Sequence, residues 1–206
     1  ISLDGSTLAG CTVTATSVSC PVSGLALGPH AIGGSVGDNA GNTAAISGGF
    51  TVIDNTAPVI DSVLPADTLF KNKARIVVAY HDLNPSSGIA PASVRVTLDN
   101  APLANCTAGM LGVSCDVYGL QFGRHLIGGS VSDNAGNTAS IAGEFKIGDS
   151  VAPVVTKVQP AGTVAGNSTV ISANFSYAEP SSGIDVASVS VTLDENLLEK
   201  CTVTEA

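Results

Sequence analysis

Alternating apolar and polar residues recur in short stretches along the chain. Residues 171–176 read ISANFS, in which Ile171, Ala173 and Phe175 alternate with polar side chains. Such alternation, bounded by Gly, Pro, Asn and Asp, is typical of β-strands that bury one face. Within residues 56–149 the pattern predicts seven strands, near 57–63, 74–81, 93–99, 103–108, 112–118, 124–132 and 139–147.

The same pattern returns with a period of 95 residues. The string DNAGNTA occurs at 38–44 and again at 133–139, and SSGI occurs at 86–89 and 181–184. Aligned without a gap, residues 1–111 and 96–206 are identical at 54 of 111 positions. Identity at this level over a fixed period indicates a tandem array of one structural unit.

The phase of the repeat divides the chain into three parts. Residues 56–149 form one complete unit, residues 1–55 match the C-terminal half of a unit, and residues 150–206 match the N-terminal half of the next. Two interpretations fit: the chain is a window on a longer array, or neighbouring chains complete its half-units. Residues 1–16 and 191–206 match the same positions of the repeat. If neighbouring chains completed the half-units, only one of these two segments would have a place in the completed unit.

Composition favours an all-β fold and narrows the range of partners. The 206 residues include 23 Gly and 10 Pro, and 4% are aromatic. The chain has 17 acidic and 8 basic residues, and its net charge of −9 disfavours nucleic acid and anionic membrane surfaces as partners. No run of 18 apolar residues occurs, so no membrane insertion is expected.

The five cysteines follow the repeat. They form two pairs with a spacing of nine and the first member of a third pair, namely Cys11–Cys20, Cys106–Cys115 and Cys201. The partner of Cys201 would fall at position 210, so truncation leaves Cys201 unpaired. We expect local disulfides between adjacent strands, since a zinc site would need two more ligands and only His30 or His125 recurs in each unit. Paired cysteines predict an extracellular or cell-surface location.

Several motifs together resemble those of bacterial immunoglobulin-like repeats. They are SSGIDVASVSVTLDE at 181–195, L-x-x-G-x-H at 25–30 and 120–125, and SVSDNAGNTA followed by F-x-x-x-D-x-x-A-P at 130–153. The resemblance covers the whole chain. It implies tandem seven-stranded immunoglobulin-like β-sandwiches, of the kind that build the stalks of large surface adhesins and serve as spacers in secreted enzymes.

Four aspartates are candidate calcium ligands. Asp38 and Asp133 open the two DNAGN turns, and Asp54 and Asp149 precede the unit boundaries, at the same spacing from the turn in each copy. Calcium binds oxygen ligands from turns and linkers in irregular geometry, and in the adhesin repeats that these resemble it stiffens the linkers. The alternative is that these residues only shape the turns. No other cofactor is expected.

Other candidate sites carry weaker signals. Asn105, Asn167 and Asn174 lie in N-x-S/T sequons and are candidate glycosylation sites. His30 and His125 recur once per unit, which favours a structural role. The GGSVG string at 33–37 matches a nucleophile elbow but lies in a predicted strand with no helix after it, so we do not expect an enzyme.

These observations predict a structural or adhesive segment of an extracellular surface protein. It would act as a semi-rigid stalk or as the building unit of a filament, with adjacent repeats or neighbouring copies as partners. The alternative is a spacer or carbohydrate-binding module of a secreted hydrolase. A sugar platform would need exposed aromatic residues, and the unpaired candidates Tyr118 and Tyr177 have no aromatic equivalent in the other copy.

Overall fold

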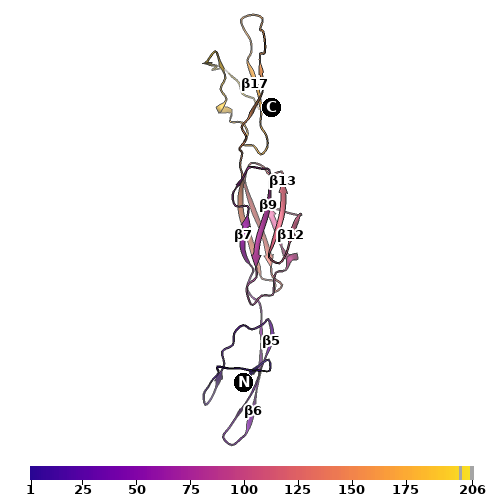
Figure 1. Ribbon diagram of the computed structural model, residues 1–206, viewed down its shortest axis with the longest axis vertical. Helices are drawn as coiled ribbons and strands as arrows, with labels where there is room; N and C mark the ends of the chain where they lie inside the picture. Colours follow the sequence, from indigo (N-terminus) through magenta and orange to yellow (C-terminus); the bar gives the residue numbers. More distant parts are fainter. Residues whose placement is uncertain (200, 205–206) are drawn as a thin grey trace.

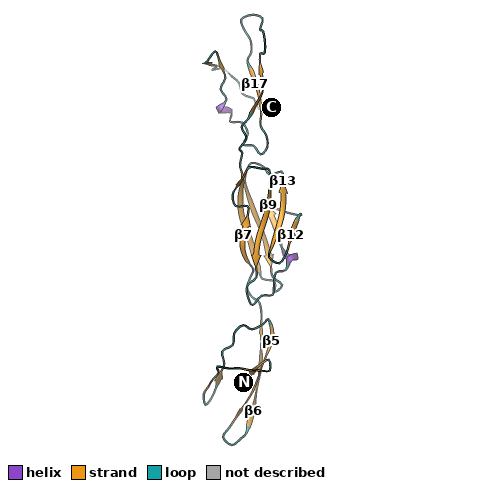
Figure 2. Ribbon diagram, viewed as in Figure 1, coloured by secondary structure: helices purple, strands orange, loops and turns teal. Residues whose placement is uncertain are grey.

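The computed structural model describes residues 1–199 and 201–204. Three parts follow one another along the longest axis of the molecule, with the complete unit in the middle (Figure 1). Strands dominate the central unit, and the last part consists largely of loops (Figure 2). Among the described residues, helical structure is confined to two short 3₁₀ turns, η1 (Pro91–Ser93) and η2 (Val186–Ser188). None of the helices in these residues has the length and apolar character to cross a membrane.

The central unit is a sandwich of two sheets. One sheet has the order β12-β13-β9-β7, made of Cys106–Ala108, Gly112–Tyr118, Lys73–His81 and Val59–Leu64. The other has the order β11-β10-β14-β15-β8, made of Ala101–Pro102, Arg95–Leu98, Gly123–Ser132, Thr138–Ile147 and Thr68–Leu69. All neighbours are antiparallel except β15 and β8. This strand order is that of an immunoglobulin-like sandwich, whose A, B, E and D strands face its C, F and G strands.

The core lies between the two sheets, where the apolar residues of alternating strands meet. On β9, Ile76, Val78 and Tyr80 are 0%, 0% and 1% exposed, as their alternation predicts. The hydroxyl of Tyr80 donates a hydrogen bond to the carbonyl of Gly109 at 2.9 Å, so its buried polar atom is satisfied. The apolar residues that face β9 come mainly from β14 and β15, and include Ile127, Val131, Ile141, Phe145 and Ile147.

Each of the seven predicted ranges overlaps a strand of the sandwich, and the structure adds two short strands, β8 and β11. Two residues are too few for alternation to be visible in a sequence. The strand β11 forms because Asp99 and Asn100 adopt φ values of 50° and 67°, which turn the chain back onto β10 in a two-residue hairpin loop.

The flanking parts contain copies of these elements, displaced by 95 residues. In the first part, β2 (Ser6–Thr7), β1 (Ser2–Leu3), β5 (Gly28–Gly37) and β6 (Thr43–Val52) form one sheet, and β3 (Thr12–Val13) pairs with β4 (Val18–Ser19). In the last part, β16 (Val154–Gln159) pairs with β17 (Ser172–Ser176), and β18 (Thr192–Leu193) with β19 (Asn196–Leu197). Register is copied as well: Leu3 opposes Ile32 as Leu98 opposes Ile127.

Candidate cation site at the first unit junction

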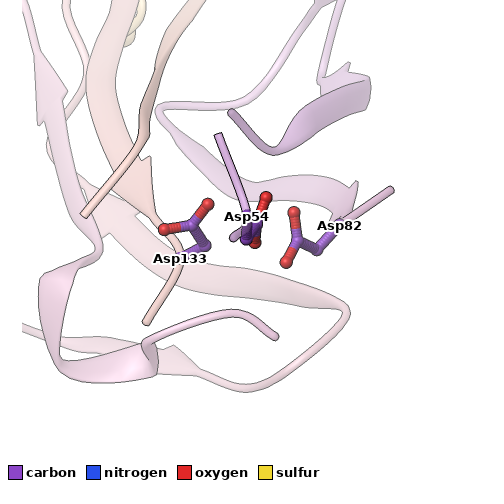
Figure 3. Close-up of side chains that lie close together, drawn as sticks. All are labelled: Asp54, Asp82 and Asp133. Carbon is purple, nitrogen blue, oxygen red and sulfur yellow. The ribbon is translucent and has the colours of Figure 1, made fainter. Parts of the chain in front are cut away.

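Three carboxylates gather where the first part joins the central unit. Asp54 lies in the linker after β6, Asp82 follows β9, and Asp133 opens the turn between β14 and β15. One oxygen of each lies within 4.8 Å of the others, and the carboxylate of Asp54 lies between those of Asp82 and Asp133 (Figure 3). Asp54 and Asp133 are 7% and 3% exposed, and Asp82 is partly buried. We call these three residues the junction cluster.

The turn sequence DNAGN explains the position of Asp133. Its carboxylate accepts hydrogen bonds from the backbone N–H and the side-chain amide of Asn137, at 2.9 and 2.7 Å. Gly136 supplies the positive φ of 94° that the turn requires. Because the side chain is held by its own turn, Asp133 is fixed at the end of the sandwich that faces the linker.

Asp54 ties the linker to the central unit. Its carboxylate accepts hydrogen bonds from the backbone N–H of Thr56 at 3.1 Å and of Ser87 at 2.7 Å. Its carbonyl accepts one from the amide of Asn137 at 3.3 Å. The N–H of Ser87 contributes most to lowering the pKa of Asp54, with smaller contributions from the Ser87 side chain and the Thr56 N–H. Asp54 is therefore a carboxylate anion at neutral pH.

Asp82 has one satisfied oxygen and one unsatisfied oxygen. Its Oδ2 accepts hydrogen bonds from the hydroxyl of Ser86 at 2.6 Å and the N–H of Gly88 at 2.9 Å. Its Oδ1 is buried and has no hydrogen-bond partner among the described residues. A buried carboxylate oxygen without a donor is unfavourable by about 1–3 kcal/mol or more. A bound cation would supply the missing interaction.

The donor set of the junction cluster suits a hard cation. All three side chains offer oxygen, and three carboxylates close together repel one another unless a positive charge lies between them. Calcium takes 6–8 oxygen ligands in flexible geometry, whereas zinc prefers nitrogen and sulfur. The oxygen donors present suit a hard cation such as Ca²⁺ better than zinc, and Asp54, Asp82 and Asp133 are the residues that could hold it.

The structure brings together two of the four aspartates proposed from the sequence. Asp54 lies close to Asp133 of the following unit, and Asp38 and Asp149 lie outside the junction cluster. For Asp38 the reason is the length of the hairpin: β5 and β6 have ten residues each, which separates the turn at Asp38 from the linker by about 30 Å. The turn of the central unit therefore lies at the junction that precedes it, beside Asp54.

Asp38 and Asp149 lie elsewhere. Asp38 caps its own turn by accepting hydrogen bonds from Ala40 and Asn42, and the side chain of Asn42 contributes most to its lowered pKa. Asp149 lies at the second junction, where its carboxylate accepts bonds from the backbone N–H and the hydroxyl of Ser182, both at 2.9 Å. Asp149 thus repeats the contact of Asp54 with Ser87.

Sequence reasoning missed Asp82 because its repeat equivalent is Tyr177. A position that differs between copies gives no periodic signal. A signal was present in the SSGI motif that follows, since Ser86 and Gly88 of this motif are the residues that bind the Asp82 carboxylate.

Both expected disulfides are present. Cys106 on β12 lies directly opposite Cys115 on β13, and their sulfur atoms are bonded. Cys11 and Cys20 form the equivalent bond beside the β3–β4 hairpin. Cys201 is free and exposed. The disulfides close the D–E hairpin of the immunoglobulin-like fold, which differs from the bond between the two sheets of antibody domains.

The two repeated histidines are structural. The Nδ1 of His125 lies 2.7 Å from a carboxylate oxygen of Asp99, its Nε2 lies 2.9 Å from the carbonyl of Gln121, and its ring stacks on Phe145. His30 makes the same contacts in the first part, with Asp4, Ala26 and Phe50. Each histidine therefore links the start of a long strand, through hydrogen bonds, to the loop before that strand and to the turn that contains the aspartate.

The remaining sequence candidates are dispersed. The three sequon asparagines, Asn105, Asn167 and Asn174, are all exposed. Tyr118 and Tyr177 are 75% and 51% exposed, and they lie on different units. GGSVG at 33–37 falls inside β5, which a turn and the strand β6 follow.

No protein-family model matches the chain, and no curated protein matches it in sequence. Among solved structures it is similar to a chimeric titin Z1Z2 that carries an exogenous KLER peptide from decorin, at 12% identity and a TM-score of 0.33, covering 68% of this chain and 74% of that one. It is also similar to SGBP-B of a Bacteroides ovatus mixed-linkage glucan utilization locus, solved with a heptasaccharide. There the identity is 12%, the TM-score 0.25 and the coverage 76% of this chain and 40% of that one. No function is transferred from likenesses at these scores.

Proposed function

We propose that this chain is a structural segment of an extracellular protein, of the bacterial immunoglobulin-like repeat type, that acts as a semi-rigid stalk. The observation that carries the proposal is the first junction, where the linker residue Asp54 is hydrogen-bonded to two separate loops of the following unit through Ser87 and Asn137. A linker fixed at two points transmits the orientation of one unit to the next. The two disulfides indicate an oxidising environment.

Proline adds to the restraint of the linker. Pro58 is buried shortly after Asp54, at the start of the complete unit. Its ring locks the backbone φ angle and so removes one degree of freedom from a connection that is already short. Stiff connections of this kind make a succession of sandwiches behave as a rod, which suits a stalk that displays another domain away from a surface.

Calcium is the second part of the proposal. An ion bound to Asp54, Asp82 and Asp133 would join the linker to the loop after β9 and to the β14–β15 turn. It would neutralise three crowded carboxylates and fill the vacant acceptor position of Asp82 Oδ1. The junction would then resist bending more strongly than its hydrogen bonds alone allow.

Small-angle X-ray scattering on dilute samples tests the proposal. We expect the profile of an elongated particle. Ca²⁺ should reduce the range of shapes needed to fit the profile, and a chelator should increase it. Asp82→Asn should abolish the response to calcium, because it removes the carboxylate with the unsatisfied oxygen. Asp116→Asn is the control, since Asp116 is exposed on β13, outside the junction cluster. If the wild-type profile can be fitted only with strongly bent shapes even in the presence of calcium, the stalk proposal is wrong. If the profile is elongated but does not change when calcium is added or removed, only the calcium proposal is wrong.

A further inference from the structure

The outer surface of one sheet of the central unit carries a groove. The groove has a volume of about 500 Å³ and lies on the face of β10, β14 and β15 that points away from the core. Alternation places the side chains outward, since Leu126 is 42% exposed between the buried residues His125 and Ile127. The residues of this outward face are Thr97, Asn100, Leu126, Gly128, Ala142 and Glu144. We call this feature the sheet groove.

The register of the strands explains why the surface is hollow. Gly128 lies between Thr97 on β10 and Ala142 on β15, so this row has no long side chain and forms the floor. A Cβ on Gly128 would lie 2.8 Å from Oγ1 of Thr97, so glycine leaves the threonine hydroxyl uncovered. In the next row Leu126 lies opposite Glu144, and Asn100 belongs to the turn between β10 and β11. Leu126, Glu144 and Asn100 form a wall beside the floor.

The equivalent sheet of the first part keeps the floor but lacks the wall. Gly33 corresponds to Gly128 of the floor. The wall positions hold residues whose side chains are at most a methyl group, namely Gly5, Ala31 and Gly49 in place of Asn100, Leu126 and Glu144. The equivalents of β11, β10, β14 and β15 are all present in this sheet as β2, β1, β5 and β6, so the difference lies in the side chains themselves. The immunoglobulin-like fold therefore does not require the wall of the central unit.

The side chains of the sheet groove combine hydrogen-bonding groups with an apolar surface. Arg124 donates from Nε and Nη2 to Oε2 of Glu144, which fixes the carboxylate and leaves its second oxygen as an acceptor for a ligand. Thr97 adds a hydroxyl and Asn100 an amide, while Leu126 supplies the apolar part of the wall. Among the residues that line the groove Glu144 alone is charged, and Arg124 balances that charge.

We propose that the sheet groove binds a neutral sugar unit of an oligosaccharide or polysaccharide. A sugar ring has hydroxyl groups around its edge and C–H groups on its faces. The hydroxyl groups would exchange hydrogen bonds with Glu144, Asn100 and Thr97, while one face of the ring packs on Leu126. Because the charge of Glu144 is balanced and the chain has a net charge of −9, an anionic sugar gains nothing there. The site would give one unit of the proposed stalk a recognition function.

Nuclear magnetic resonance of the whole chain tests the inference. The probes are cello-, malto-, xylo-, manno- and chito-oligosaccharides, and an oligogalacturonide is the anionic comparison. Each is added up to about 10 mM, so that a Kd of about 1 mM is detected. We expect at least one neutral probe to shift the backbone amide signals of Gly128 and Ala142 in a saturable way. The signals of Gly33 and Ser47, at the equivalent positions of the first part, should stay in place.

Filling the groove should prevent binding. Ala142→Phe places a large side chain on the floor and should weaken binding by about tenfold or more. Ser47→Phe is the matched control, because it makes the same change at the equivalent position of β6 and should bind like the wild type. Glu144→Gln should also weaken binding, since it keeps the shape of the wall and removes the charged acceptor. Well-dispersed amide signals would show that each variant folds.

Three results would overturn the inference: no shift with any neutral probe, equal shifts at Gly33 and Gly128, or tighter binding of the oligogalacturonide. Shifts that depend on protein concentration in the absence of sugar would also overturn it, because they would assign the groove to a second copy of the chain. The stalk proposal survives each of these results, since it rests on the first junction and has its own scattering test.

Discussion

At the residue scale, His125 illustrates how a side chain is held in one protonation state. Its two ring nitrogens face two acceptors, the carboxylate of Asp99 and the carbonyl of Gln121. A neutral imidazole has only one N–H, so satisfying both acceptors requires the charged ring. Burial by itself lowers the pKa of His125, but the hydrogen bonds to Gln121 and Asp99 outweigh it, and the pKa is raised.

The raised pKa of His125 predicts that stability decreases toward alkaline pH. The folded state binds this proton more tightly than the unfolded state, so the contribution is fully present below the unfolded pKa, about 6.5. It is lost as pH rises through the folded value. Urea unfolding between mildly acidic and mildly alkaline pH should show the free energy of unfolding falling, and less steeply in His125→Gln.

His30 has the same contacts as His125 and a pKa raised mainly by its hydrogen bond to Asp4, so it adds to the effect. A His125 resonance titrating below about 6.5 in the folded protein would contradict the explanation.

At the scale of elements, the β12–β13 hairpin depends on its disulfide. The hairpin is an edge of its sheet, and the bond between Cys106 and Cys115 closes a loop of only nine residues of separation. Closing a loop of this size removes conformational entropy from the unfolded chain. The sulfur of Cys115 is also buried in the core, so the bond attaches the edge strand to the packed interior.

Replacing both cysteines of this hairpin with alanine should therefore lower the free energy of unfolding by about 2–3 kcal/mol. Chemical denaturation followed by circular dichroism measures the change. Cys201→Ser is the control, since Cys201 is free and exposed. This variant should leave the unfolding midpoint of the central unit unchanged. A double variant as stable as the wild type would mean that hairpin packing alone fixes this edge.

Elements and sites differed in how far the sequence could predict them. Alternation identified strands such as β9, because Ile76, Val78 and Tyr80 must face the core together. It could not reveal β8 or β11, which consist of two residues each. The cation site was harder, because the short spacing between Asp38 and Asp54 in the sequence says nothing of the hairpin that separates them. Contact between Asp54 and Asp133 depends on which end of a sandwich meets the linker, and that is a property of the assembled fold.

At the scale of the whole molecule, the arrangement of the units depends on a few side chains at their junctions. Asn137 is central at the first junction, because its amide donates to the carbonyl of Asp54 and to the carboxylate of Asp133. It thereby joins the β14–β15 turn to the linker.

Asn137→Ala should accordingly loosen the first junction while leaving the sandwich folded. We expect faster cleavage between Ile53 and Asp54 by a protease that cuts on the amino side of aspartate, because the linker would leave its site more often. The matched control is Asn42→Ala, which removes the equivalent side-chain bond to Asp38 in the turn of the first part. Equal cleavage rates in the two variants would show that Asn137 stabilises its own turn only.

The replacement of Asp82 by Tyr177 at the second junction has a mechanical consequence. Joints along a rod act like springs in series, so their compliances add and the softest joint decides how far the whole rod bends under load. If calcium stiffens the first junction, most of the bending occurs at the second junction, and stiffening the first junction further has little effect on the whole rod. The hydrogen bond between Ser182 and Asp149 then restrains the joint that bends most. Under a bending load, the rod would therefore bend mainly at the second junction.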